Sequence, residues 1–309
     1  MLLVCAVLAA ACGPSVGDGV LVLRLSSGFA VGELDRMTVE WTVDGSPIEP
    51  KSYELGVSAG KLQLPAEFRL TEVASGVDIQ AVVTGYARSS DGQTERIVVQ
   101  RSLRTQGVAG QVLMYRMNLD GQCGLYPADS EKQSGPTCND PVETCIAGSC
   151  RSSEVPSSSL LPYGEPVTDD ACKQAGGGAP MVVVGQGQSD FFFQDDYEEA
   201  QVEAGPQGGH HIWVAVRAIN LSQSGVITTV GGEIPALNLS ISPLKVIFTM
   251  EPDEGGYCKL YGLRFQIDID GGPIEPMLGQ ELKVLVTMSD QDNVEATAER
   301  WVTLSQTIQ

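Results

Sequence analysis

Apolar and polar residues alternate along most of this chain, which is the pattern of β-strands that bury one face. In the first part of the chain, turn residues such as Asp44-Gly45 and Asp91-Gly92 separate runs of strand length. These runs are residues 20–25, 37–43, 77–83 and 112–119. Apolar residues at helical spacing do not persist there for three turns. About seven short strands over about 100 residues predict an antiparallel, immunoglobulin-like β-sandwich.

The same alternation returns after residue 166 and predicts a second sandwich of about seven to nine strands. Its runs are residues 181–184, 211–217, 237–241, 245–248, 263–269, 281–287 and 298–304. Between the two sandwiches, Ser and Pro are frequent in residues 152–166, as in an extended linker. We therefore predict an all-β chain with an N-terminal sandwich (13–121), a cysteine-rich segment (122–151), a linker (152–166) and a C-terminal sandwich (167–309).

The first twelve residues form an apolar run that is too short to cross about 30 Å of hydrocarbon and is typical of a signal peptide. Leu8-Ala9-Ala10-Ala11-Cys12, followed by Gly13, resembles a bacterial lipobox. The resemblance implies cleavage before Cys12, acylation of that cysteine and, because Gly13 is not Asp, sorting to the outer membrane. More than one acyl chain would make this anchor stable. The alternative is an ordinary secretory signal in which Cys12 is incidental.

Six cysteines remain after Cys12, an even number that suits an oxidising compartment. They are Cys123, Cys138, Cys145, Cys150, Cys172 and Cys258. The first four lie in a turn-rich segment too small for its own core, so disulfides are expected there. Zinc is the alternative, but only the Cys145-x4-Cys150 spacing fits a zinc knuckle. Of three possible pairings we expect Cys123–Cys145 with Cys138–Cys150, and then Cys172–Cys258.

The formal net charge of −20 and the pI near 4.3 restrict the partners. A surface without excess Lys and Arg cannot release counterions from phosphates, so nucleic acid is excluded as a partner, and anionic lipid surfaces are equally improbable. Most acidic residues lie after residue 121. The C-terminal sandwich is therefore the acidic domain, which suits solubility or cation binding.

Both histidines of the chain lie in one glycine-rich segment, which makes it the strongest candidate for binding. The segment comprises Gln207, Gly208, Gly209, His210 and His211. With acidic residues upstream at 195–199, a zinc or copper site is conceivable. Neighbouring residues on a strand point to opposite faces, however, so the two imidazoles would not easily share one ion. The alternative is a structural strand entry with one exposed histidine.

Two predicted turns carry carboxylates two residues apart and are candidates for calcium. They contain Asp268 with Asp270, and Asp290 with Asp292. Neither turn is followed by the glutamate that completes an EF-hand, and Asp and Gly are also the usual residues of ordinary turns. A shared calcium site would require the four carboxylates to converge.

Catalytic motifs are missing from the sequence. No Gly-x-Ser-x-Gly elbow stands on a predicted strand-to-helix turn, and no phosphate-binding Gly-x-x-x-x-Gly-Lys loop is present. We therefore expect a protein that is not an enzyme and that needs no cofactor.

The final hairpin, residues 285–304, resembles the closing strands of PKD-like and other immunoglobulin-like bacterial repeats. The order of lipobox, β-domain, cysteine knot, linker and acidic domain is similar to that of uncharacterised surface lipoproteins of myxobacteria-like Gram-negatives. This resemblance implies an immunoglobulin-like fold and an envelope location, but no activity. We expect an exported, lipid-anchored structural or binding module whose partner is an envelope or surface protein or a glycan. The alternative is a zinc- or copper-dependent hydrolase or redox protein built on His210 and His211.

Overall fold

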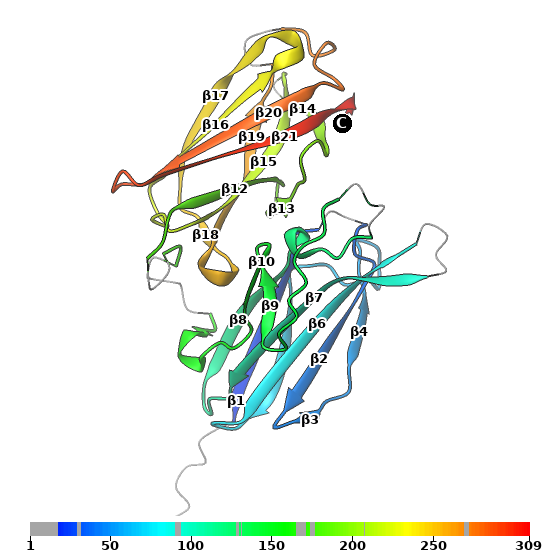
Figure 1. Cartoon of the computed structure of the whole chain (residues 1–309), viewed down its shortest axis with the longest axis vertical. Coiled ribbons are helices and arrows are strands. Elements are labelled where there is room, and N and C mark those ends of the chain that lie inside the picture. The colour runs from blue at the N-terminus through cyan, green and yellow to red at the C-terminus, as the bar shows by residue number, and fades with distance from the viewer. Residues whose placement is uncertain are drawn as a thin grey trace, which may run out of the picture.

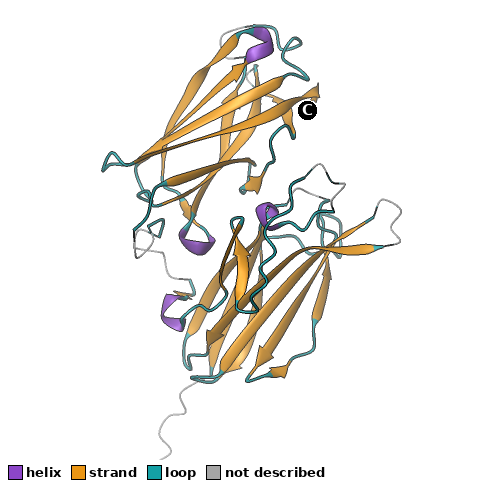
Figure 2. Cartoon of the chain, viewed as in Figure 1, coloured by secondary structure: helices purple, strands orange, loops and turns teal. Residues whose placement is uncertain are grey.

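The computed structural model describes residues 18–29, 32–89, 94–127, 130, 132–164, 171–173, 177–206, 208–268 and 272–309. The chain forms two β-sandwich domains, one above the other in Figure 1, and only short 3-10 turns interrupt the strands (Figure 2). No helix in this described part of the chain has the length and apolar character that a membrane crossing requires. Cys12, in residues 1–17, lies outside the described residues.

The N-terminal domain consists of two facing sheets. One contains β1 (Gly19–Ser27), β5 (Ala66–Val73), β8 (Val112–Leu119) and β11 (Leu161–Pro162) in the order β11-β8-β1-β5. The other contains β2 (Arg36–Val43), β3 (Ser46–Pro47), β4 (Lys51–Glu54), β6 (Asp78–Arg88) and β7 (Glu95–Gln106). Alternate residues of both sheets, among them Leu23, Val83 and Leu103, are fully buried between them. The predicted alternation is thus a real division between core and surface.

The cysteine-rich segment packs along the open side of this sandwich. It contains the 3-10 turn η1 (Gly121–Cys123) and the hairpin of β9 (Glu143–Ile146) and β10 (Ser149–Ser152), which lies beside β7. The structure has the expected disulfides Cys123–Cys145 and Cys138–Cys150. A segment with few apolar residues is thereby held in place by covalent bonds and by the neighbouring domain.

The first part of the predicted linker differs from an extended spacer. After η2 (Ser157–Ser159), Leu160 is buried in the N-terminal core and β11 pairs with β8. The backbone of Arg104 also hydrogen bonds to Ser153 and Val155. A Ser- and Pro-rich composition does not exclude strand pairing at a sheet edge, where proline is tolerated. Residues 152–162 therefore belong to the N-terminal domain.

The C-terminal domain is a larger sandwich. One layer contains β12 (Met181–Gln186), β13 (Phe192–Phe193), β15 (His210–Ile219), β18 (Glu251–Pro252) and β19 (Cys258–Gln266). The other contains β16 (Val226–Ile234), η3 (Pro235–Leu237), β17 (Leu239–Phe248), β20 (Glu281–Ser289) and β21 (Glu295–Ile308). Strand β14 (Glu199–Ala204) pairs with β15 and with β21, so it joins the two layers.

Each domain also contains one parallel pair, which the prediction of antiparallel sandwiches did not include. Strand β1 runs parallel to β8, and β14 runs parallel to β21. In both cases nearly the whole domain lies between the two strands, which is more than the crossover that parallel pairing requires. The closing strand of each domain is therefore bound to one of its first strands.

Candidate functional site

The two domains meet at a cluster of buried charges, which we call the seam. Arg101 of β7 is fully buried, and its Nη2 donates to Glu254 Oε1 at 2.5 Å. Its Nη1 donates to the Asn118 carbonyl, and its Nε donates to Thr144 Oγ1 at 3.2 Å. Each nitrogen of this guanidinium thus has an acceptor, which is what burial of a charge requires.

Glu254 comes from the C-terminal domain, but its carboxylate is bound by the N-terminal domain. It lies in η4 (Glu254–Gly256), a turn that projects toward the N-terminal domain (Figure 1). Besides Arg101, the hydroxyl of Tyr115 donates to its Oε1 and the backbone N–H of Asn118 donates to its Oε2, both at 2.8 Å. Burial, followed by the charge of Glu254, raises the pKa of Tyr115, so the phenol remains a donor. The C-terminal domain therefore inserts one side chain into a complete binding site.

A second contact between the domains has the opposite order of charges. Arg217 of β15 is 2% exposed and pairs with Asp120 of the N-terminal domain and, at 2.8 Å, with Asp253 of its own domain. Burial would lower the pKa of Arg217, but the two carboxylates outweigh it and raise this pKa. Burial would likewise raise the pKa of Asp253, but Arg217 and Lys259 hold it below its usual value. Arg217 and Asp253 thus stay charged inside the molecule.

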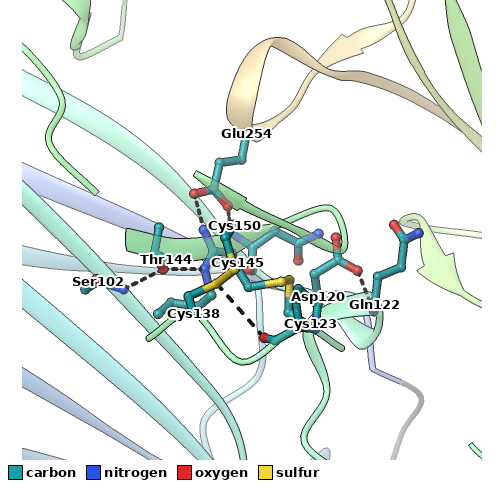
Figure 3. Close-up of a disulfide and its surroundings, with 12 residues drawn as sticks. Ser102, Asp120, Gln122, Cys123, Cys138, Thr144, Cys145, Cys150 and Glu254 are labelled. Carbon is teal, nitrogen blue, oxygen red and sulfur yellow. Dashed lines mark hydrogen bonds and ion pairs between the residues drawn. A yellow bond between two sulfur atoms is a disulfide. The ribbon is translucent and has the colours of Figure 1, made fainter. Parts of the chain in front are cut away.

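The disulfide-bonded hairpin supports the seam from the side, as Figure 3 shows. Thr144 of β9 is 3% exposed, and its Oγ1 accepts from Arg101 and also from the backbone N–H of Ser102 at 3.0 Å. Asp120 caps η1, where its Oδ1 accepts from the N–H of Gln122 at 3.0 Å. Because Cys123 and Cys145 are joined, the residues that hold Arg101 and Arg217 belong to one crosslinked unit.

The third disulfide fixes the other half of the seam. Cys172 is joined to Cys258, the first residue of β19, as expected from the sequence. Both cysteines are fully buried in the C-terminal core. Asp253 and Glu254 immediately precede this strand, and the backbone N–H of Asp253 donates to the Tyr257 carbonyl. The loop that carries both acidic residues is therefore short and tied at its end.

The two predicted histidines have different surroundings. His210 Nδ1 lies 2.8 Å from Asp268 Oδ2, and the N–H of His210 also donates to Asp268. His211 is 3% exposed, neither ring nitrogen has a hydrogen-bond partner, and its ring meets Trp213 edge-on at 4.9 Å. Gly208 and Gly209 have positive φ angles and form the turn into β15, whereas Gln207 lies outside the described residues. The imidazoles therefore do not converge on a common point, and the zinc or copper hypothesis loses its geometric basis.

The binding surface expected from residues 207–211 together with residues 195–199 stays a prediction, but its described parts lie at the two ends of one strand. Strand β14 lies between these segments, and six residues at about 3.3 Å each place them about 20 Å apart. The acidic segment instead contributes to the domain contact, since Lys132 pairs with Glu198 at 2.8 Å and with Glu33. The two segments are close in sequence but distant in space, because the extended strand β14 lies between them.

The aspartates of the predicted turns are engaged by hydrogen bonds. Asp290 accepts from the N–H groups of Ser222, Asp292 and Val294, and Asp268 accepts from His210. Burial would raise the pKa of Asp290, but these hydrogen bonds lower it. Asp270 lies outside the described residues, and Asp292 is exposed beside Lys173. Among the described residues, no group of three or more His, Cys, Asp and Glu side chains is placed to hold a metal ion. A shared calcium site stays a prediction.

The sequence interpretation missed the seam residues Arg101, Arg217 and Glu254. One signal was present, because Arg101 and Arg217 stand at inward positions of alternating strands, where charged residues are rare unless they are paired. Their charged partners lie between 36 and 153 residues away along the chain. Only the folded chain brings the opposite charges together.

Comparison with known proteins identifies no family. No family model matches the sequence, and no curated protein matches it. Three solved structures show weak similarity. A tetra-tandem repeat from the extending region of a large adhesion protein has a TM-score of 0.23 and 9% identity over 94% of this chain and 50% of that chain. A 1.5-MDa bacterial ice-binding adhesin has a TM-score of 0.20 and 8% identity over 93% of this chain and 64% of that chain.

The third is the Bacteroides ovatus protein SGBP-B in complex with a mixed-linkage heptasaccharide, with a TM-score of 0.18 and 13% identity over 88% of this chain and 60% of that chain. This chain thus spans between half and two thirds of the three structures. TM-scores of this size identify neither a shared fold nor a shared function.

Proposed function

We propose that the protein is a non-catalytic, exported module of the cell envelope that holds two β-sandwich domains in a fixed orientation. In this role an acylated Cys12 fixes one end of the chain to the outer membrane. The N-terminal sandwich then acts as a rigid spacer, and the C-terminal sandwich is presented to an envelope or surface partner. The leader sequence and the three disulfides support export, because disulfides persist in oxidising compartments.

The buried charge cluster at the seam carries this proposal. Domain contacts within a chain are commonly small and polar, and relative motion is expected unless the contact is large and apolar. Here, however, Glu254 and Arg217 of the C-terminal domain pair with Arg101 and Asp120 of the N-terminal domain, and all four side chains are buried. A shifted arrangement that keeps these groups buried would leave Arg101 and Asp120 without their partners, which costs several kcal/mol. One fixed orientation therefore follows from the chemistry of the contact.

Removal of one charge from the seam tests whether the two domains are held in a fixed orientation. In Glu254→Gln the side chain keeps its size but loses the charge that offsets Arg101. We expect small-angle X-ray scattering to show a larger radius of gyration, and calorimetry to replace one unfolding transition with two. Glu281→Gln, an exposed carboxylate at the start of β20, is the control and should behave as the wild type. Independent unfolding of the two domains in the wild type would refute the proposal.

The anchor is tested separately in a Gram-negative host. We expect the full chain to incorporate an alkyne-labelled fatty acid and to fractionate with the outer membrane. Cys12→Ser should abolish both results while the domains still fold. Labelling that persists in Cys12→Ser, or a wild type that is never labelled, would contradict lipid anchoring and leave the rigid seam unaffected.

A further inference from the structure

A hollow of about 370 Å³ lies in the C-terminal domain where two strands share one edge of β15. Strand β12 pairs with β15 as far as Gln186, opposite Val214, and β14 joins the same strand at Glu203, opposite His211. Ile212 and Trp213 lie in the interval and line the hollow together with Phe192. Its volume is within the range of small-ligand sites, about 300–1,000 Å³.

A second hollow of about 350 Å³ adjoins the first at the domain contact. Ser189 and Phe192 line both of them. The remaining wall of the second hollow belongs mainly to the N-terminal domain and includes Phe29, Leu34 and Leu64. The segment with β13 is fixed there, because the N–H of Phe193 donates to the carbonyl of Gly28 at 3.2 Å. The two hollows are therefore neighbours across the domain contact while the seam is closed, and together they are called the groove.

The aromatic wall of the first hollow is held in position before any ligand arrives. Trp213 is half-buried, and its Nε1 donates to Glu203 Oε2 at 2.9 Å. The buried His211 ring contacts the same indole edge-on. An aromatic face is electron-rich and apolar, so it suits C–H groups that carry slight positive charge. The face of a pyranose ring presents such C–H groups.

Planar polar groups surround this aromatic wall. Within the described chain, the side-chain amides of Gln186 and Gln188 make no hydrogen bond, and neither does Glu203 Oε1. An amide both donates and accepts, and a carboxylate oxygen accepts. Sugar hydroxyls need both kinds of partner at the rim of the ring. An aromatic platform with free amides beside it therefore matches a saccharide better than a purely apolar ligand.

Charge selects among saccharides. Among the described residues, neither hollow is lined by Lys or Arg. Glu203 lines the first hollow, whereas Asp190, which lines the second, is paired with Lys259 at 2.5 Å. Carboxylate, sulfate or phosphate groups would find no unpaired Lys or Arg in this lining and would be repelled by the net charge of −20. We propose that this groove binds a neutral oligosaccharide, with one sugar ring packed on Trp213. This inference rests on the proposed function, because a closed seam joins the two hollows.

The test uses the full chain and isothermal titration calorimetry. The probes are linear hexasaccharides of β-1,4-linked glucose, β-1,4-linked mannose, β-1,4-linked N-acetylglucosamine and α-1,4-linked glucose, with hexagalacturonate as the acidic comparison. We expect saturable binding of at least one neutral hexasaccharide and at least about tenfold weaker binding of hexagalacturonate, a difference of about 1.4 kcal/mol. If none of the neutral probes bound saturably, the proposal would be overturned.

Matched variants locate the site. Trp213→Ala should weaken binding at least about tenfold. The double variant Gln186→Ala with Gln188→Ala should weaken it as well, and these side chains can be removed without disturbing the core. Trp301→Ala is the control, because Trp301 packs on Tyr197 and lines neither hollow. Binding that survives Trp213→Ala and the double variant, or that falls equally in Trp301→Ala, would overturn the assignment.

The variant Glu254→Gln distinguishes a failure of the saccharide proposal from a failure of the rigid-module proposal. A loosened seam should weaken binding of the neutral hexasaccharide, which is expected to span both hollows. It should not weaken binding of a disaccharide of the same linkage, added as a further probe, because that ligand needs only the first hollow. If Glu254→Gln loosens the seam but no saccharide binds to the wild type or the variant, saccharide binding in the groove is refuted and the rigid module is supported. Hexasaccharide binding that is unchanged in a loosened variant would refute the groove across the domains.

Discussion

The hydroxyl of Thr144 accepts two hydrogen bonds in a place from which water is excluded. One comes from the Arg101 guanidinium and the other from the backbone of Ser102. A buried donor without an acceptor costs about 1–3 kcal/mol. We expect Thr144→Val, which keeps the shape, to lower the free energy of unfolding by about that amount in urea denaturation at fixed pH. Thr144→Ser keeps the acceptor and should lose much less; equal losses in both variants would show that the methyl group matters instead.

His211 makes stability depend on pH. Burial, followed by the charge of Arg264, lowers the pKa of His211. The pKa of a histidine in an unfolded chain is about 6.5. As the pH falls below that value, the His211 imidazole takes up a proton in the unfolded chain but stays neutral in the folded one. The stability that a neutral His211 contributes is therefore present above the unfolded pKa and is lost as the pH falls toward the lower folded pKa.

We expect the melting temperature to decrease as the pH is lowered below about 6.5. The decrease should be smaller in His211→Phe, which fills the same space without a titrating group. His210→Gln leaves His211 in place and should retain the wild-type dependence. An identical pH profile for His211→Phe and the wild type would contradict this assignment.

At the scale of elements, the disulfides differ in the length of chain that they close. Cys172–Cys258 spans 86 residues, whereas Cys138–Cys150 spans 12. In the chain-entropy model their removal costs about 4.5 and about 3 kcal/mol, because a longer loop gains more freedom in the unfolded state.

We therefore expect Cys172→Ala with Cys258→Ala to lower the melting temperature more than Cys138→Ala with Cys150→Ala, as measured by circular dichroism. The first pair also ties the loop of Asp253 and Glu254, so its loss should loosen the seam. The opposite order would indicate that the small hairpin depends on its crosslinks more than the large core does.

The strands show where alternation is sufficient for prediction. Residues 112–119 were predicted as a strand and form β8 with the same bounds, and residues 211–217 lie within β15. Strand β7 was not named, because the buried Arg101 interrupts its apolar series. Strand β14 was also missed, since its short acidic sequence becomes a strand only through pairing with β15 and β21. Local pattern predicts a strand when one face is apolar, and tertiary pairing decides the others.

For the molecule as a whole, acid should open the seam before it unfolds the domains. Arg217 and Lys259 keep the pKa of Asp253 below its usual value in spite of burial. A carboxyl with a lowered folded pKa stabilises the fold above its unfolded pKa of about 3.9, and that stability is lost as the pH falls through the folded pKa.

We expect calorimetry to show one transition at neutral pH and two transitions once the pH is lowered below about 3.9, with a larger scattering radius. Asp253→Asn should show two transitions already at neutral pH, because Arg217 then keeps only Asp120. A single transition throughout this range would contradict the role of the seam charges.

The alternation of side chains determined the β class, and the number and compartment of the cysteines determined that there would be crosslinks. Both are local or compositional properties, because strand period and redox state do not depend on which residues meet. The seam, the separation of the two histidines and the groove at Trp213 were decided by tertiary structure. Each of them depends on contacts between strands distant in the chain: Arg101 meets Glu254 across 153 residues, and Trp213 lies in a gap left by β12 and β14. A buried charge or a binding hollow is a property of surroundings, which a linear pattern does not contain.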